Sequence, residues 1–120
     1  MFLKTFRYRI KPAKMGEYLA IRQQADAIYH RFLPQSPTYL QSATDPYQWL
    51  EMYHYTDESS YRVSLEQMQQ DEELAKLWVR FQAILDPTYP AAVDEYRYGA
   101  STNGEATESW SESEYQSPEE

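Results

Sequence analysis

Apolar and polar side chains alternate at the start of the chain. Between residues 2 and 10, one set of alternate positions holds Phe6, Tyr8 and Ile10, and the other holds Thr5, Arg7 and Arg9. A period of two predicts a β-strand, because successive side chains of a strand point to opposite faces. Pro12 has no N–H to donate to a neighbouring strand, so we expect this strand to end before it.

Two helical patterns follow in the chain. From about residue 13 to residue 33, apolar side chains recur three or four positions apart, at Tyr18, Ile21, Ala25, Ile28 and Phe32. This stripe predicts an amphipathic helix, which Pro34 and Pro37 end. A second stripe runs from Tyr61 to Leu85 after a cap at Asp57 or Ser59. The polar stretch 69–71 interrupts it, so we expect a break or a kink there.

Three further segments have strand patterns. Residues 38–43 form a weak one, a turn at 44–47 follows, and residues 48–55 alternate strongly. The short connection predicts an antiparallel hairpin. Residues 92–98 form the last strand. The order β-α-β-β-α-β predicts an α+β protein with a ferredoxin-like antiparallel sheet and both helices on one face.

The predicted third strand carries bulky side chains on both faces. Trp49, Tyr53 and Tyr55 share one face, whereas Leu50 and Met52 occupy the other. One layer of helices covers only one face of a sheet, and burying the other set of side chains in a partner would be favourable. We therefore expect a homodimer whose two sheets face each other. The alternative is that tyrosine hydroxyls and nearby charges keep the open face wet.

Charge is distributed unevenly along the chain. The net charge is -8, but residues 101–120 hold six glutamates and no lysine or arginine. This segment is also poor in apolar residues, so we predict a folded domain over 1–100 and a disordered acidic tail over 101–120. The nearly neutral domain has no basic stripe for phosphates. We therefore expect neither a nucleic acid nor a membrane as its partner.

Composition also narrows the cofactor classes. The chain has no cysteine, three glycines and two histidines, His30 and His54. These histidines lack the spacing of metal ligands, and a phosphate-cradling loop needs more glycine. We expect no metal and no cofactor. No signal peptide and no apolar run of about 20 residues is visible, which favours a cytoplasmic location.

Two segments carry a resemblance to known families. Tyr8–Lys14 and Gly16–Leu19 resemble the strand-to-helix junction of dimeric α+β barrel proteins, except that Ala13 stands where a glycine is usual. The second half, with Tyr53–Asp57, Tyr61, Arg62, Asp71, Phe81 and Leu85, looks like the antibiotic-biosynthesis-monooxygenase-like and NIPSNAP-like groups. The resemblance covers about residues 2–98 and rests on element lengths and core positions.

The resemblance implies a dimeric barrel, often with a pocket between the sheet and the helices. Some members are cofactor-independent oxygenases of polycyclic phenols or quinones, some degrade haem, and many have no known reaction. The haem-degrading branch uses an axial histidine on the kinked helix and an asparagine on the first strand. Neither residue is present at those places here. The resemblance therefore favours an oxygenase over a haem-degrading enzyme.

Candidate site residues lie mainly on the predicted third strand. Glu51 could act as a base, with Tyr53 beside it and His54 as a second proton carrier. The substrate-binding candidates are Arg7, Arg9, Tyr55 and Trp49. If the strand registers match, the arginines meet the Glu51 face on the open side of the sheet and bind a phenolic or acidic small molecule. The alternatives are cross-strand pairing for the arginines and a packed core position for His54.

Three interpretations remain open at this point. The first is a small-molecule enzyme of the dimeric barrel type, such as a cofactor-independent monooxygenase acting on a phenolic or other small aromatic substrate. The second is a non-catalytic dimeric protein that binds a ligand, or a partner through its acidic tail. The third is a domain with a purely structural role, whose pocket is filled by its own tyrosines. A concave pocket on the open face with converging polar groups would favour the first interpretation, and a cavity filled by Trp49 and the tyrosines would favour the other two.

Overall fold

The computed structural model describes residues 1–97, and the predicted acidic tail lies outside them. Seven elements follow one another: β1 (Phe2–Arg9), α1 (Met15–Tyr29), β2 (Thr38–Gln41), β3 (Gln48–Tyr55), α2 (Glu58–Gln69), α3 (Glu72–Ile84) and β4 (Ala92–Arg97). A single 3-10 turn, η1 (Pro12–Lys14), leads from β1 into α1. This order confirms the predicted sequence of strands and helices, with the second helical region divided in two.

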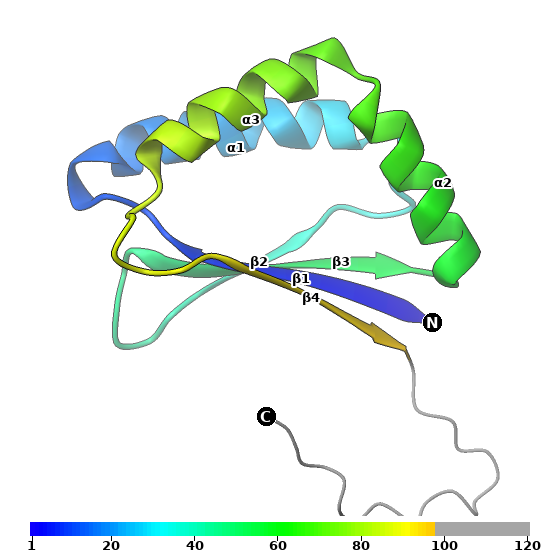
Figure 1. Ribbon diagram of the computed structural model, residues 1–120, viewed down its shortest axis with the longest axis horizontal. Helices are drawn as coiled ribbons and strands as arrows, with labels where there is room; N and C mark the ends of the chain where they lie inside the picture. Colours follow the sequence, from blue (N-terminus) through cyan, green and yellow to red (C-terminus); the bar gives the residue numbers. More distant parts are fainter. Residues whose placement is uncertain (98–120) are drawn as a thin grey trace, which may run out of the picture.

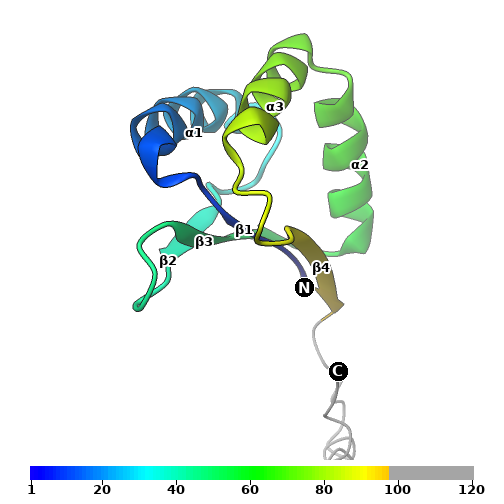
Figure 2. The ribbon, with the colours of Figure 1, turned by 60° about the vertical axis from the view of Figure 1, so that its left-hand side comes forward.

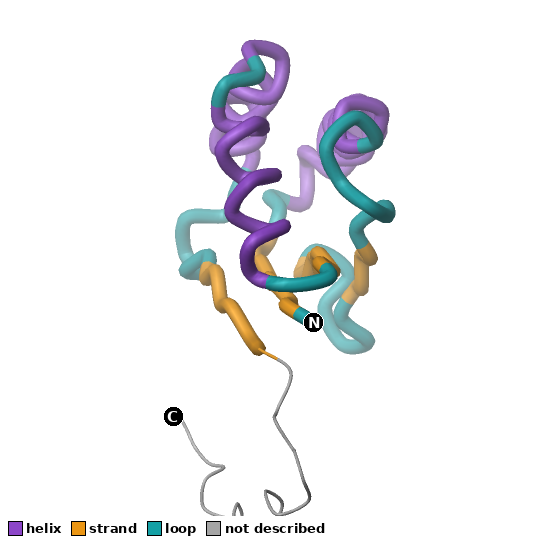
Figure 3. Tube along the Cα trace, turned by 90° about the vertical axis from the view of Figure 1, so that its right-hand side faces the viewer, coloured by secondary structure: helices purple, strands orange, loops and turns teal. Residues whose placement is uncertain are grey.

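The strands form one antiparallel sheet in the order β2-β3-β1-β4. All three α-helices lie on the same side of it (Figures 1 and 3). The predicted α+β, ferredoxin-like arrangement is therefore confirmed. Within residues 1–97, the helices are too short or too polar to cross a membrane.

Capping explains why the second helical region divides. The Asp57 carboxylate accepts a hydrogen bond from the Ser60 N–H at 2.7 Å and begins α2. The Asp71 carboxylate accepts one from the Leu74 N–H at 2.9 Å and begins α3. A capping residue has non-helical backbone angles, so a cap inside a helical pattern starts a new helix. The interruption predicted at 69–71 is therefore a corner between two helices.

The first helix is shorter than its apolar stripe. α1 ends at Tyr29, and residues 30–33 close a turn in which the Arg31 and Phe32 N–H groups bond to carbonyls three residues back. The residue before a proline avoids helical backbone angles, so the helix tightens and stops before Pro34. Phe32 still packs against the core from this turn.

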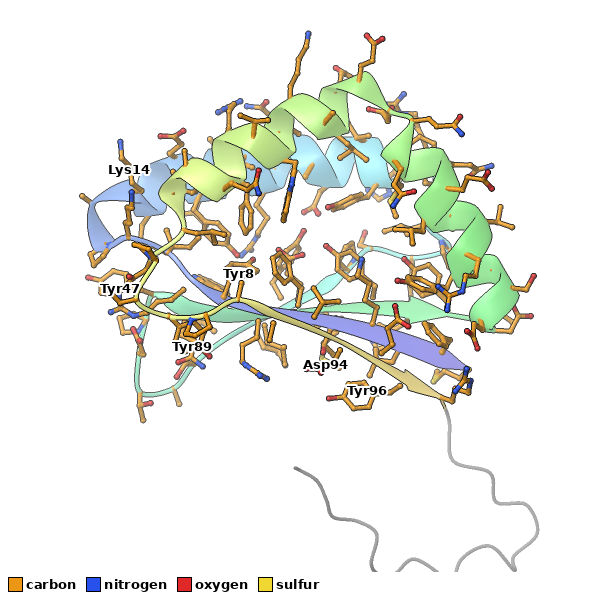
Figure 4. The ribbon with its side chains drawn as sticks, viewed as in Figure 1. Tyr8, Lys14, Tyr47, Tyr89, Asp94 and Tyr96 are labelled. Carbon is orange, nitrogen blue, oxygen red and sulfur yellow. The ribbon has the colours of Figure 1, made fainter. Side chains whose placement is uncertain are left out.

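Alternation along β1 creates two different surfaces on the sheet. Lys4, Phe6 and Tyr8 point toward the helices, on what we call the covered face. Leu3, Thr5 and Arg7 point the other way, onto the open face, together with their cross-strand neighbours Leu40, Leu50, Met52, His54, Asp94 and Tyr96. Figure 4 shows Tyr8 between the sheet and the helices, and Asp94 and Tyr96 on the opposite side.

The core lies between the covered face and the helices. α1 packs beside α3, and the side chains of Tyr8, Ile10, Tyr18 and Ile84 are fully buried there. α2 rises from the end of β3, and α3 then runs across the sheet beside α1 (Figures 1 and 2). α2 and α3 thus cover different parts of the same sheet face, and both contribute side chains to the candidate site described below.

Candidate functional site

A cavity of about 410 Å³ lies between the covered face and the helices. All four strands and all three α-helices contribute to its wall, which is mostly aromatic and aliphatic. The charged side chains in that wall are Lys4, Arg22 and Glu51. A mainly apolar cavity of this size with a few polar groups is typical of small-molecule sites.

Glu51 lies in the wall of this cavity with only 8% of its surface exposed. It is on β3, and the alternation of that strand turns it toward the helices together with Trp49 and Tyr53. The Tyr8 hydroxyl donates to Glu51 Oε2 at 2.5 Å, and the Tyr53 hydroxyl donates to Oε1. The Tyr8 hydroxyl is in turn 2.8 Å from the hydroxyl of Tyr18. Both carboxylate oxygens are therefore held by phenols, and their direction is set by β1, β3 and α1.

Burial sets the acid–base character of this group. It raises the pKa of Glu51, against the hydrogen bonds from Tyr53 and Tyr8, which lower it. Burial and the nearby Glu51 charge raise the pKa of Tyr8 and of Tyr53. Burial also raises the pKa of Tyr29 to about 12. The phenols are therefore neutral donors at neutral pH, and the carboxylate is the group whose basicity is enhanced.

Lys4, on β1, is a cation in the cavity wall whose charge acts on Glu51. Its Nζ lies 5.6 Å from the ring centroid of Tyr53 and 5.8 Å from that of Tyr61. Burial lowers the pKa of Lys4, while the charges of Glu51 and Glu95 oppose this shift. The opposite charges of Lys4 and Glu51 attract each other, so the protonation state of each side chain affects the pKa of the other.

Arg22 is the second cation in the wall, and it comes from α1. Its guanidinium carbon lies 4.1 Å from the ring centroid of Tyr39 and 5.1 Å from that of Trp49. Within residues 1–97, its Nη1 is a buried polar atom without a hydrogen-bond partner, as are Trp49 Nε1 and Tyr55 Oη. Arg22 and Tyr55 both line the cavity. Buried polar atoms without partners are uncommon in proteins, so these two are candidates to contact a ligand.

The structure brings together part of the predicted site. Glu51, Tyr53 and Tyr55 all line the cavity. Trp49 shares their face and packs against the ring of Tyr18, with centroids 5.2 Å apart. The expectation that this group gathers on the open side of the sheet was wrong. These side chains lie on the covered face, because the helices pack over the alternate positions that carry the tyrosines and Trp49.

The remaining predicted residues do not join that group. Arg7 pairs across the sheet with Leu50, and His54 pairs with Leu3, which places both on the open face. Arg9 forms ion pairs with Asp45 at 2.7 Å and Asp86 at 2.5 Å. It therefore holds the turn before β3 to the loop after α3. The predicted meeting of the arginines with the Glu51 face was wrong, since the side chains of Arg7 and Glu51 point to opposite sides.

Three contributors to the cavity escaped sequence reasoning. Lys4 falls on the same alternate positions as Phe6, and this period could have placed it in the wall. Arg22 follows Tyr18 by one helical turn, which puts it at the edge of the apolar stripe. Tyr18 was identified only as a core residue. Period and spacing give the face of a residue, but they do not show which core positions surround an empty volume.

Comparison with known proteins gives a likeness in structure only. No family model matches the sequence, and no curated protein matches it. A NIPSNAP family protein from Agrobacterium tumefaciens is similar over 80% of this chain and 90% of its own, with a TM-score of 0.67 and 19% identity. An antibiotic biosynthesis monooxygenase is similar over 83% of this chain and 100% of its own, with a TM-score of 0.67 and 13% identity.

A NIPSNAP domain protein from Burkholderia xenovorans is also similar, over 83% of this chain and 96% of its own, with a TM-score of 0.65 and 19% identity. These proteins match the two groups that the sequence resembles. At such low identity the likeness shows a shared fold, and activity has to be argued from the cavity itself.

Proposed function

We propose that this protein is a small-molecule enzyme of the dimeric α+β barrel type, a cofactor-independent monooxygenase acting on a hydroxylated aromatic compound. The observation that carries the proposal is Glu51, a buried carboxylate with a raised pKa in the wall of an aromatic cavity. A general base is effective when its pKa is brought closer to the working pH. Ring-lined walls provide stacking surfaces for an aromatic substrate.

The proposed chemistry begins with proton transfer. The substrate hydroxyl gives its proton to Glu51, and the resulting phenolate is electron-rich enough to reduce dioxygen. One oxygen atom forms a new bond to ring carbon and the O–O bond breaks, while the second oxygen atom leaves as water. For 1-naphthol the balanced reaction with one dioxygen yields 1,4-naphthoquinone and one water. The substrate supplies all the electrons that dioxygen accepts. The structural likeness to an antibiotic biosynthesis monooxygenase supports this reaction class.

The test compares ligands that differ by one hydroxyl group. We expect the protein to bind 1-naphthol about tenfold or more tightly than naphthalene, because a hydrogen bond to a charged group contributes about 1.5–3 kcal/mol. Glu51→Gln should narrow this difference, whereas Glu66→Gln, at an exposed position of α2, should leave it unchanged. Isothermal titration measures the binding, and an oxygen electrode with product chromatography measures turnover.

The outcomes separate the two candidate functions. Oxygen uptake with quinone formation that Glu51→Gln abolishes supports the monooxygenase. Selective binding of 1-naphthol without oxygen uptake supports the second candidate, a non-catalytic ligand-binding protein. One observation favours that candidate: both oxygens of Glu51 are already engaged by Tyr8 and Tyr53. Equal affinity for 1-naphthol and naphthalene contradicts the role of Glu51 in either function.

We further propose that the open face forms a homodimer interface with a second copy of the chain. Leu40 is 47% exposed and Tyr96 is 51% exposed on this face, beside Leu50 and Met52. Burying such side chains contributes about 25 cal/mol per Å². Met52→Asp should shift the protein from dimer to monomer in sedimentation velocity. Val79→Asp, at an exposed position of α3, is the control and should stay dimeric.

A further inference from the structure

We propose that Arg22 forms a carboxylate-binding subsite in the cavity, so that the natural ligand is an aromatic acid. The inference deepens the proposed function, because it assigns a second chemical group to the ligand of the same cavity. It does not depend on oxidation: a binding protein without catalysis would use the subsite in the same way.

The first support is the position of the Arg22 guanidinium. It is held against the rings of Tyr39 and Trp49, at 4.1 Å and 5.1 Å from their centroids. Cation–π contact with two aromatic rings restricts the position of the guanidinium without using its N–H groups as hydrogen-bond donors. Arg22 is also one of the residues that line the cavity. A planar donor in the wall of a cavity is suited to a planar acceptor such as a carboxylate.

The second support is an unmet hydrogen bond. Nη1 of Arg22 is buried and has no acceptor within the described part of the chain. A buried donor loses its hydrogen bonds to water, and without an acceptor no protein hydrogen bond offsets this cost in free energy. Asp26, one helical turn after Arg22, accepts a hydrogen bond from the Tyr39 hydroxyl at 2.7 Å and lies more than 4.0 Å from the Arg22 nitrogens. The Arg22 guanidinium interacts with the Tyr18 hydroxyl, but its Nη1 stays without an acceptor within residues 1–97. Because Arg22 lines the cavity, a ligand bound there could supply this acceptor.

The third support is the pattern of ion pairs. Within residues 1–97, four arginines lie within 4.0 Å of a carboxylate: Arg9, Arg31, Arg62 and Arg97. Arg22, which lines the cavity, has no such partner in that range. The cavity wall thus carries two cations, Lys4 and Arg22, and one acidic group, Glu51. An anion with a single charge would balance this set.

The wall also decides which anion fits. Phosphate groups are usually bound by glycine-rich loops and helix N-termini, whereas this wall consists mainly of aromatic and aliphatic side chains. A phosphate would also place up to two negative charges in a cavity that already contains Glu51. A carboxylate on an aromatic ring brings one charge and a flat apolar body, which matches both the guanidinium and the wall.

The test uses 1-naphthoate as the anionic probe, with 1-naphthol and naphthalene for comparison. We expect 1-naphthoate to bind the wild-type protein more tightly than naphthalene. Arg22→Met should weaken its binding about tenfold or more, since a charge-assisted hydrogen bond is removed. Binding of 1-naphthol should change much less. Arg80→Met, at an exposed position of α3, removes the same charge from a residue that does not line the cavity and should leave 1-naphthoate binding unchanged.

Two further variants make the result decisive. Lys4→Met removes the other cation of the wall, and a loss of 1-naphthoate binding in this variant but not in Arg22→Met overturns the proposal. Arg22→Lys keeps the charge without the planar donor set, so it should bind 1-naphthoate less tightly than wild type. It replaces Arg22→Met if circular dichroism shows that the methionine variant does not fold, and wild-type affinity in Arg22→Lys again overturns the subsite.

The same measurements separate this inference from the proposed function. If 1-naphthoate binding depends on Arg22 but 1-naphthol gains nothing from Glu51, the subsite stands and the monooxygenase proposal fails. If 1-naphthol binding depends on Glu51 while 1-naphthoate binds Arg22→Met as it binds wild type, the proposed function stands and the subsite is wrong.

Discussion

The two faces of the sheet come from the same strands but differ in what they bury. On the covered face, Glu51 and its tyrosine partners form a hydrogen-bonded group beneath the helices. On the open face, Leu50 and Met52 lie near Thr5, and no helix between residues 1 and 97 covers them. One residue of shift along a strand exchanges the two environments.

This difference is the basis of the two proposals, a ligand site on the covered face and a dimer interface on the open face. The covered face holds the buried Glu51 among aromatic side chains, which raises the pKa of this carboxyl and suits proton transfer. The open face presents apolar side chains on a pleated surface, which suits contact with another surface. Measurements of the free energy of unfolding can test whether side chains on the two faces contribute differently to stability.

The largest expected effect is the loss of packing on the covered side. Phe81, on α3, is buried and contacts the ring of Tyr8 edge-on with centroids 4.9 Å apart. Phe81→Ala should lower the free energy of unfolding by about 3–5 kcal/mol, because it removes buried surface and leaves a void. Leu40→Ala on the open face should lower it by less than about 1 kcal/mol in the monomer. Chemical denaturation at low protein concentration measures both. Equal losses of unfolding free energy in the two variants would show that packing on the covered side is no more important for stability than packing on the open face.

A smaller effect is expected from one hydroxyl group. Tyr53→Phe removes a donor to the buried Glu51 carboxylate while it keeps the ring. An unsatisfied buried acceptor costs about 1–3 kcal/mol, so the variant should be less stable by that amount at neutral pH. Tyr96→Phe, half-exposed on the open face, should change stability by less than about 0.5 kcal/mol. A Tyr53→Phe variant as stable as wild type would show that Glu51 does not need this donor.

The smallest expected effect is a change in how the free energy of unfolding depends on pH. The folded-state pKa of Glu51 is raised above its ordinary value of 4.5, so the folded state binds the proton more tightly than the unfolded state. The contribution of this group to stability is fully present below pH 4.5 and is lost as pH rises through the folded-state pKa. Its slope is at most about 1.4 kcal/mol per pH unit. Glu51→Gln should flatten this part of the stability profile, and an unchanged profile would contradict the shift.

Much of the fold could be predicted because its signals are local. The signals are the period of two in β1 and β3, the stripe that ends before Pro34, the cap at Asp57 and the interruption at 69–71. Each depends on neighbouring residues. The arrangement of the strands follows from their order along the chain, since few topologies satisfy it. These features require no knowledge of distant side chains.

The site could be predicted only in part because it depends on which face the helices cover. Alternation correctly groups Glu51 with Tyr53 and Tyr55, but it does not say on which side of the sheet the group lies. Both faces of β3 are rich in large side chains, so hydrophobicity alone does not decide. The pairing of Arg7 with Leu50 then places Arg7 on the opposite side from Glu51. The hydrogen bond from Tyr8 to Glu51 joins residues 43 positions apart in the sequence. Such a contact depends on how the strands pair and pack, which a local sequence pattern does not show.

The corner at Asp71 has a consequence for how this architecture can diversify. Because α2 and α3 start from separate caps, each is anchored independently, and the residues on both sides of the corner, Met68, Gln69, Leu74 and Ala75, line the roof of the cavity. An insertion or a change of side-chain size at this elbow can resize the chamber while the strand pairing below stays intact. The size of the cavity and the stability of the sheet thus depend on different segments of the chain, so mutation can change the first with little effect on the second.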